Sequence, residues 1–494
     1  MSKMEAGMET GRVHAGWLML VGALLALWLF GCARTPAPPA SSPAAIPAEP
    51  VATVDPQLAF ATRLAEATLE QIARQHVLPG AADALHARFA ERLTEQLAET
   101  PWREPRSTNK LATPADTVRR LHLDHLAQPI LPAVEAVLAE LVRGLGTDSV
   151  YFGRRQFELL QHSPEETAGI GVLMGRQDQQ RVIREVIQGT PADRAGLKPG
   201  DELLAIDGEP VAGQSRDWIM LRLQGVPAST LALRIRFADG DSRHIRLQRE
   251  LLDLPLVEGR WLRGGIAYVR LRTLSDSIVP AFNETFLGLI RKQRAPRALV
   301  LDLRHNRGGL LDSAVQLADL FVAEGTLLTL RGRVESELIR HVAQPRSEIL
   351  ERDLPLAVLI DGETAAGAES IAAALQDHRR ALLVGQRSRG AGLLHTIIKL
   401  PGKRGLKLAT GHLYRPTDEA IAPQGVVPDI CLFDGQARLI ARGDGSASGR
   451  ECGREPGQQR PGTDPALDQV ARILADKALY RDLLEGRVRQ LPAP

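Results

Sequence analysis

The spacing of apolar residues predicts helices along the first folded part of the chain. In residues 58–77, "LAFATRLAEATLEQIARQHV", and in residues 130–146, "ILPAVEAVLAELVRGLG", apolar side chains recur at the period of one helix face. We therefore expect a mainly helical N-terminal domain over residues 57–165. This stretch holds no cluster of residues suited to chemistry, so we interpret it as a packing or dimerisation element.

Shorter apolar runs follow, and they predict strands. The runs "GIGVLM", "RVIREVI" and "LALRIRF" have the length and composition of strands. Between the last two, the glycines and proline of "GTPADRAGLKPGDELLAIDG" predict two turns with one helical turn between them, followed by a strand that ends at Ile206. These patterns predict a β-rich domain over residues 166–250.

From residue 251 to residue 435 the pattern alternates between strands and helices. The strand-like runs are "GIAYVRL", "RALVLDLR", "LPLAVLID" and "ALLVGQR", and the helical runs are residues 277–293, "LLDSAVQLADLFV" and "ESIAAALQDHRR". This order predicts an α/β layer of largely parallel strands, with sites at their carboxyl ends. Residues 436–494 then predict a polar, glycine-rich loop and one terminal helix, "PALDQVARILADKALYRDLL".

The N-terminus has the pattern of an export signal. An apolar run of about 15 residues follows Lys3 and Arg12, and it is short for a membrane-spanning helix of about 20 residues. We expect residues 1–31 to be a signal peptide. The sequence "LFGC" resembles the lipobox of bacterial lipoproteins, which predicts lipidation of Cys32. Phe30 is an unusual residue there, so a retained membrane anchor is the alternative.

Residues 32–56 then predict an extended linker rich in proline and alanine. We expect the folded body to lie in the cell envelope, tethered to a membrane and facing the periplasm. Arg34 is not an acidic signal for retention at the inner membrane, which favours the outer membrane.

Composition excludes some classes of function. Lys and Arg total 61 against 59 Asp and Glu, and aromatic residues make up 4%, so nucleic-acid binding is not expected. The twelve histidines show no metal-ligand spacing, and we predict neither a metal nor another cofactor. Cys431 and Cys452 are expected to form a disulfide across the polar loop, with two separate thiols as the alternative.

The segment "AGLKPGDELLAIDG" resembles the signature of PDZ domains. That resemblance implies that the backbone around Gly169, Ile170, Gly171 and Val172 receives the C-terminal carboxylate of a peptide, which then adds as a strand. The alternative is a PDZ-shaped spacer whose groove is empty or occupied by the chain itself.

Several motifs in order resemble the carboxy-terminal processing peptidases, also called tail-specific proteases. They are the PDZ segment, "LVLDLRHNRGGLLDSAVQLADLFV", "ALQDHRRALLVGQ" and "GVVPDI", and the resemblance runs over residues 57–475. It implies an α/β peptidase core with an inserted, β-rich PDZ domain and an N-terminal helical region. In that family, a serine activated by a lysine cleaves the substrate chain.

The positions that this resemblance assigns to the catalytic pair are both alanine. Counting from "ALQDH" places the nucleophile at Ala366, and the "RGAG" motif places the lysine at Ala391. An alanine supplies neither a nucleophile nor a base. Possible substitutes for the nucleophile are Ser370, Thr364 and Ser388, and His395 is the candidate base because an even spacing on a strand would put it on the side of residue 391.

Other cleft residues match the family pattern in part. Gly308 and Gly309 are expected to keep a turn that supplies an oxyanion donor, Gly367 to line the same cleft, and Asp377 to match a family residue that orients the site. Arg307 replaces the proline usual in the family, and it is expected either to bind a carboxylate or to face solvent.

We therefore favour a catalytically inactive relative that binds protein C-terminal tails as an adaptor or as a regulator of an active envelope protease. The alternative is an active serine-type endopeptidase with a rearranged site, built on Ser370 or Thr364 with His395. A third hypothesis is a structural envelope protein that uses the fold only as an interaction surface.

Overall fold

The structure is a computed structural model of the chain. It describes residues 55–76, 84–97, 113–124, 129–146, 148–161, 168–177, 180–214, 216–237, 239–252, 255–292, 295–333, 338–344, 354–433, 436–439, 452, 464–488 and 491. The predicted signal peptide, Cys32 and nearly all of the predicted linker lie outside these residues. Within the described part, no helix is both long and apolar enough to cross a membrane.

Four helices form the N-terminal region, as their apolar period predicts. Asp55 caps the first helix by accepting a 2.8 Å hydrogen bond from the Gln57 N–H, and Pro56 occupies the first helical position, which needs no donor. The buried faces of the helices pack against Leu406 and Leu408 from a strand far along the chain. The helices are α1 (Pro56–Gln75), α2 (Leu85–Leu97), α3 (Pro114–Asp124) and α4 (Ile130–Gly144).

The PDZ-like region is a six-stranded sheet with two helices. Strand β7 alternates buried and exposed residues, as expected for a strand with one face on a core. Strand β3 pairs only with β4, so its other edge is open among the described residues. The elements are β2 (Ala168–Gly169), β3 (Val172–Gln177), β4 (Gln180–Val186), α6 (Pro191–Arg194), β5 (Glu202–Ile206), β6 (Glu209–Pro210), α7 (Arg216–Leu223), β7 (Thr230–Arg236), β8 (Ser242–Gln248) and β9 (Glu250–Leu251).

The third region contains a seven-stranded sheet in the order β10-β11-β12-β15-β16-β19-β20. Strands β11, β12, β15, β16 and β19 are parallel, and β12 and β15 are completely buried, as expected for strands covered on both faces. The strands are β10 (Val257–Leu262), β11 (Ile266–Leu271), β12 (Ala298–Asp302), β15 (Leu356–Ile360), β16 (Leu382–Gly385), β19 (Ile430–Phe433) and β20 (Gln436–Leu439).

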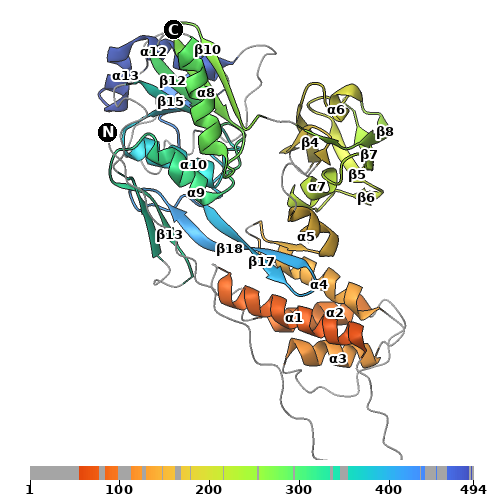
Figure 1. Cartoon of the computed structure of the whole chain (residues 1–494). Helices are drawn as coiled ribbons and strands as arrows, with labels where there is room; N and C mark the ends of the chain where they lie inside the picture. The colour runs from red at the N-terminus through yellow and green to blue at the C-terminus, as the bar shows by residue number, and fades with distance from the viewer. Residues whose placement is uncertain are drawn as a thin grey trace, which may run out of the picture. The chain divides into compact units, whose positions relative to one another are not determined.

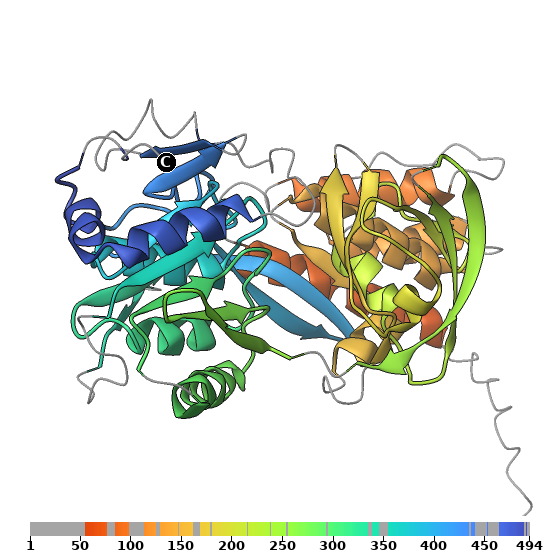
Figure 2. The ribbon, with the colours of Figure 1, turned by 90° about the horizontal axis from the view of Figure 1, so that it is seen from above.

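Helices cover both faces of this sheet (Figure 1). Helices α8 (Ile278–Lys292), α9 (Leu311–Asp319) and α10 (Gly367–Asp377) pack on one face. Helices α12 (Pro465–Ala475) and α13 (Lys477–Leu484) pack on the other, and Figure 2 shows them in dark blue on the side opposite the green α8. The predicted α/β core with a PDZ domain and an N-terminal helical region is confirmed.

The terminal helix differs from its prediction because it is broken at Asp476. The Asp476 side chain accepts hydrogen bonds of 3.0 and 3.1 Å from the Ala478 and Leu479 N–H groups and so begins a new helix. The apolar period continues through the break, and the sequence pattern therefore hid it.

A second sheet was not predicted. It has five strands: β1 (Val150–Phe152), β13 (Thr326–Arg331), β14 (Leu338–Val342), β17 (Leu393–Leu400) and β18 (Arg404–Tyr414), and α5 (Arg154–Leu160) follows β1. Strands β17 and β18 form a long hairpin that begins two residues after Ala391. The hairpin therefore connects the candidate cleft to the apolar core of the N-terminal helices.

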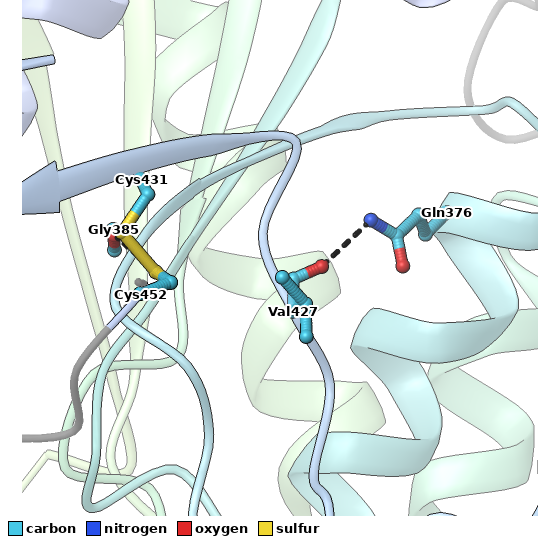
Figure 3. Close-up of a disulfide and its surroundings, with 5 residues drawn as sticks. All are labelled: Gln376, Gly385, Val427, Cys431 and Cys452. Atoms are coloured by element: carbon cyan, nitrogen blue, oxygen red, sulfur yellow. Dashed lines mark hydrogen bonds between the residues drawn. A yellow bond between two sulfur atoms is a disulfide. The ribbon is translucent and has the colours of Figure 1, made fainter. Parts of the chain in front are cut away.

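Cys431 in β19 forms a disulfide with Cys452 (Figure 3). Cys431 also pairs with Gly385 of β16 in the parallel ladder. Close to the disulfide, the Gln376 side-chain amide donates a 3.0 Å hydrogen bond to the Val427 carbonyl, which fixes the approach to β19 against the end of α10.

Candidate functional site

The candidate site lies where α10 begins. Ala366 immediately precedes the helix with φ of 51°, a left-handed conformation that is uncommon for residues other than glycine and costs about 1–3 kcal/mol. The Ala365 N–H donates a 3.0 Å hydrogen bond to the Asn306 carbonyl, which ties this turn to the loop after β12. Ala366 is partly exposed, so its side chain borders accessible space. The backbone thus presents residue 366 in a strained position although that residue carries only a methyl group.

Glu369 brings residues 366 and 391 together. One carboxylate oxygen, Oε2, accepts hydrogen bonds from the Ala366 N–H at 2.8 Å and from the Ala391 N–H at 3.0 Å. The other, Oε1, accepts from the Gly390 N–H at 2.6 Å and from the Ser388 hydroxyl at 2.5 Å. Because two nitrogens share one acceptor, they lie within about 6 Å of each other. The structure therefore juxtaposes the two alanine positions.

Glu369 was not predicted from the sequence. A glutamate three residues after the start of a helix is the signal of a capping box, and its return bond to the Ala366 N–H has that form. Its contacts with residues 388–391 are long-range and have no local signal. Glu369 is completely buried. Burial raises the pKa of Glu369, and the hydrogen bonds from Ser388 and the three N–H groups act in the opposite direction without cancelling it.

The loop that carries Ala391 is held by its neighbouring glycines. A Cβ at Gly390 would lie 2.1 Å from the Pro423 carbonyl oxygen, and a Cβ at Gly392 would lie 2.6 Å from the Ile421 Cβ. Only glycine permits such close packing. The backbone around residue 391 is therefore tightly fixed, although its side chain cannot titrate.

Gly308 packs directly against Ala366, but its N–H is already used. A Cβ at Gly308 would lie 2.9 Å from the Gly367 nitrogen and 3.1 Å from the Ala366 Cβ. The Gly308 N–H donates a 2.9 Å hydrogen bond to the Asn306 side chain. Within the described residues, the N–H groups of Gly309 and Gly367 donate to no protein acceptor. These two groups, and not the Gly308 N–H, are the candidate oxyanion donors.

The candidate nucleophiles are buried and hydrogen-bonded. The Thr364 hydroxyl donates to the Leu303 carbonyl at 2.9 Å, and the Ser388 hydroxyl accepts from the Val426 N–H at 2.7 Å in addition to its bond to Glu369. The Ser370 hydroxyl lies inside α10, 3.4 Å from the Ala366 carbonyl oxygen. All three residues are at most 2% exposed. None presents its hydroxyl to solvent as a nucleophile must.

The spacing argument for His395 was wrong. Strand β17 begins at Leu393, after a tight turn in which the Leu393 N–H bonds the Ala391 carbonyl, so residue 391 is not in the strand. A register shift between Leu394 and His395 also interrupts the alternation of sides. An even spacing therefore does not place His395 on the side of residue 391.

Two other predictions for the cleft are corrected. Asp377 ends α10, about 15 Å along the helix from Ala366, where it forms a 2.5 Å ion pair with Arg415. Asp377 therefore cannot orient a group beside residue 366. Arg307 forms an ion pair with Glu363, so its charge is already neutralised.

The predicted peptide-binding loop has the backbone that such a role requires. Gly171 has φ of 83°, and a Cβ there would lie 2.2 Å from the Thr190 hydroxyl oxygen, so only glycine fits. The carbonyls of Gly171 and Ile170 accept hydrogen bonds from the Ile187 and Ala192 N–H groups, both at 2.9 Å. Within the described part of the chain, the Ile170 and Gly171 N–H groups donate to no protein acceptor. The loop thus holds two available donors.

Comparison with known proteins identifies both folded units. Residues 265–432 match peptidase family S41, and residues 182–236 match the PDZ domain. A carboxy-terminal-processing protease of Bartonella bacilliformis is 29% identical over 334 residues, which cover 67% of this chain and 76% of that protein. This chain is a homologue of the carboxy-terminal processing proteases.

Two further comparisons support the fold of this processing-protease homologue. A carboxyl-terminal-processing protease of Picosynechococcus is 30% identical over 275 residues, which span 53% of this chain and 64% of that relative. The solved photosystem II D1 C-terminal processing protease shares 22% identity with a TM-score of 0.55 and covers 86% of this chain and 99% of its own. At that identity, the second comparison shows the fold alone.

The chemistry available to the processing-protease homologue follows from its groups. Backbone donors remain beside residue 366, whereas Ala366 and Ala391 themselves carry neither hydroxyl nor amine. Among the described residues, no group of three or more His, Cys, Asp or Glu side chains is arranged to hold a metal ion. The arrangement can orient a peptide carbonyl through N–H groups, but its central side chains offer no covalent step.

Proposed function

We propose that this protein is a catalytically inactive carboxy-terminal processing protease homologue that binds the C-terminal tails of proteins. It acts as an adaptor or as a regulator of an active protease in the cell envelope. One observation carries the proposal: the two alanines that Glu369 holds side by side occupy the positions that the family resemblance assigns to the serine and the lysine. In the serine–lysine mechanism that the resemblance implies, a hydroxyl and a neutral amine must meet there.

Tail binding is supported by the PDZ domain. The Ile170 and Gly171 N–H groups suit a terminal carboxylate, and the open edge of β3 suits an added strand. In an antiparallel pair, alternate residues direct their N–H and C=O groups away from the partner strand, so β3 adds further donors to the Ile170 and Gly171 N–H groups. The Gly171 carbonyl accepts from the Ile187 N–H, one residue after β4, and Val172 lies opposite Val186, so the polar groups of Val172 point toward the open edge. Recognition of this kind uses backbone groups and needs no catalytic side chain.

We further propose that Cys32 is lipidated and tethers the body to a membrane, with its folded part in the periplasm. The support is the apolar run, the "LFGC" motif and the extended linker that follows. Mass spectrometry of the mature protein tests this directly. A diacylated N-terminal Cys32 is expected, and an unmodified cysteine preceded by an intact leader contradicts it.

The experiment for tail binding uses the carboxylate of the probe. Fluorescence anisotropy compares a labelled peptide with an apolar, free C-terminus and the same peptide with a C-terminal amide. We expect the amide to bind about tenfold or more weakly, because it loses the charge-assisted bonds to backbone N–H groups. Equal binding of the two peptides overturns carboxylate capture.

Substitutions in the 169–172 loop are poor tests of carboxylate binding. Ile170 is 2% exposed in the PDZ core, and any Cβ at Gly171 overlaps Thr190, so substitutions there disturb the fold along with the ligand. The amide probe changes only the ligand and leaves the protein intact. The same peptides, fused to an unfolded protein, serve as substrates in a cleavage assay in which no hydrolysis above background is expected.

A further inference from the structure

A second cavity lies apart from the candidate cleft and from the 169–172 loop. It has a volume of about 740 Å³, and its walls come from α4, β1, α5 and the PDZ domain. This volume is in the range of ligand pockets, about 300–1,000 Å³. Neither residues 366 and 391 nor residues 169–172 line it. The proposed function gives this cavity no role.

The cavity wall carries an excess of positive charge. Six arginines and three carboxylates line it. Two of the carboxylates are already engaged, since Glu135 pairs with Arg404 at 2.5 Å and Glu209 pairs with Arg222 at 2.8 Å. The third, Asp207, accepts a 2.9 Å hydrogen bond from a backbone N–H of β7. The arginines are Arg143, Arg154, Arg155, Arg222, Arg249 and Arg404.

Three of these arginines form no ion pair in the described part of the chain. Arg154 pairs with Glu158 at 3.3 Å, whereas Arg143, Arg155 and Arg249 form no ion pair. Arg143 and Arg155 are exposed on α4 and α5. Their positive charges therefore face the cavity and solvent without a counter-ion.

Arg249 is the unusual member of this set because it is buried, with 5% exposure. Its guanidinium donates to neutral acceptors only: the carbonyls of Leu223 at 3.2 Å, Thr230 at 3.2 Å and Arg222 at 2.8 Å, and the Ser229 hydroxyl at 3.0 Å. These four bonds leave one of its five N–H donors unassigned. A buried cation that forms no ion pair is costly, so an anion bound beside it is stabilised.

The residues around Arg249 affect its charge and fix its position. Burial lowers its pKa, Asp207 raises it, and the positive charge of Arg155 lowers it. Gly225 leaves room for the guanidinium, since a Cβ there would lie 3.0 Å from the Arg249 Nε. Two of the carbonyls that Arg249 bonds are the last of α7, where a cation is favoured by the helix dipole. The fold therefore positions a positive charge at the cavity wall.

The remaining walls suit a polypeptide better than a bare ion. Trp218, Leu221 and Val150 contribute apolar surface, and the Arg222 guanidinium lies 4.5 Å from the centre of the Trp218 ring. A stacked aromatic–arginine pair beside free cations can contact both the apolar and the acidic side chains of a peptide. Helix α7 supplies this wall through Trp218 while Ile219 packs into the PDZ core, so the cavity lies on the outer side of the domain.

We propose that this cavity binds an acidic segment of a polypeptide, with Arg143, Arg155 and Arg249 as the groups that recognise its carboxylates. The inference deepens the proposed function, because it predicts that preferred tails carry Asp or Glu residues upstream of their C-terminus. Backbone N–H groups recognise any terminal carboxylate, so the 169–172 loop alone cannot distinguish one tail from another. In this proposal the cavity makes that distinction.

The test measures anisotropy with the intact mature protein and four peptides. One pair carries four glutamates upstream of an apolar C-terminus and the other carries glutamines at those positions, each with a free or an amidated terminus. We expect the glutamate peptides to bind about fivefold or more tightly than their glutamine counterparts, with the difference shrinking as salt rises. The double variant Arg143→Gln/Arg155→Gln is expected to lose that difference while still binding the glutamine peptide.

A matched variant controls for net charge. Arg234→Gln/Arg246→Gln removes two exposed, unpaired arginines from β7 and β8, outside the cavity, and should keep the preference. Arg249 itself stays unchanged because it caps α7. Equal binding of glutamate and glutamine peptides overturns this inference and leaves carboxylate capture standing. A glutamate preference that survives amidation supports the inference even if carboxylate capture fails.

Two other results also contradict the inference. One is a glutamate preference that both double variants lose equally, because the effect would then come from overall charge. The other is binding to vesicles of anionic lipid, but to no peptide, that the Arg143→Gln/Arg155→Gln variant alone loses. That outcome would assign the cavity to a membrane surface.

Discussion

The 169–172 loop and the cleft at residues 366 and 391 share two backbone features but differ in what their proposed chemistry requires. Both contain a residue with positive φ, Gly171 at 83° and Ala366 at 51°, and both have N–H groups without a protein acceptor in the described chain. Tail binding needs only those backbone groups, whereas hydrolysis also needs two specific side chains. A function carried by the backbone survives substitutions that keep the fold, but a function carried by side chains can be lost while the scaffold remains.

The largest effect is expected when the cleft regains the serine and lysine side chains that the family resemblance assigns to it. The double variant Ala366→Ser/Ala391→Lys should raise cleavage of an unfolded substrate by about 10²-fold or more, because Glu369 already holds the two positions together. Activity should rise with pH, since the introduced amine acts only when neutral. Either single variant is the control and should remain at background. A double variant that folds and is equally inactive would show that the scaffold is no longer competent.

The second prediction concerns the backbone of the cleft. Gly308→Ala should lower the free energy of unfolding by about 3 kcal/mol, since it combines an unfavourable φ of 88° with a clash against the Gly367 nitrogen. Gly264→Ala is the matched control, with φ of 80° and open space, and should cost about 1 kcal/mol. Denaturant unfolding measures both. Equal losses would mean that the contact between Gly308 and α10 contributes nothing.

The third prediction uses the buried carboxyl that joins the two alanine positions. Because the pKa of Glu369 is raised, the folded protein holds its proton more tightly than the unfolded chain does. Its contribution to stability is therefore complete below the ordinary carboxyl pKa and is lost as pH rises through the raised value. Unfolding followed over this range should show a fall that Glu369→Gln removes. An unchanged slope in the variant contradicts the assignment.

The smallest expected effect concerns the ion pair between Glu363 and Arg307, the residue that stands where the family usually has proline. The Arg307–Glu363 ion pair is partly exposed, so a double-mutant cycle with alanine should give a coupling of about 0.5 kcal/mol. Peptide binding should not change in either single variant. A clear loss of affinity in Arg307→Ala alone would revive the interpretation that Arg307 binds a carboxylate of the ligand.

Much of the fold was predictable because burial imposes a pattern on the sequence. Strands β12 and β15, buried throughout, and the amphipathic α1 and α4 follow from their apolar residues. Strand β14 is almost entirely exposed and β17 has a single buried residue, Leu400, so neither gave such a pattern. These two strands were therefore missed, whereas β13 and β18 are largely buried and were overlooked despite their burial.

The sequence paired residues 366 and 391, which the structure places close together, but it did not predict the contacts that join them. The motif spacing located residues 366 and 391, yet Glu369 joins them through bonds that span up to 22 residues, and no local pattern encodes such bonds. Asp377 was assigned to the site from the family resemblance, but the whole length of α10 separates it from Ala366. His395 was misplaced because a turn and a register shift, both invisible in the sequence, precede it.

We predict that no side chain of this protein forms a covalent bond to a substrate carbonyl. Incubation of the mature protein with a fluorophosphonate, followed by peptide mass spectrometry, tests it most directly. Our account predicts no adduct on the wild-type chain and an adduct at position 366 in the Ala366→Ser/Ala391→Lys variant. A stoichiometric adduct on any wild-type serine or threonine, Ser370, Thr364 and Ser388 above all, would contradict it.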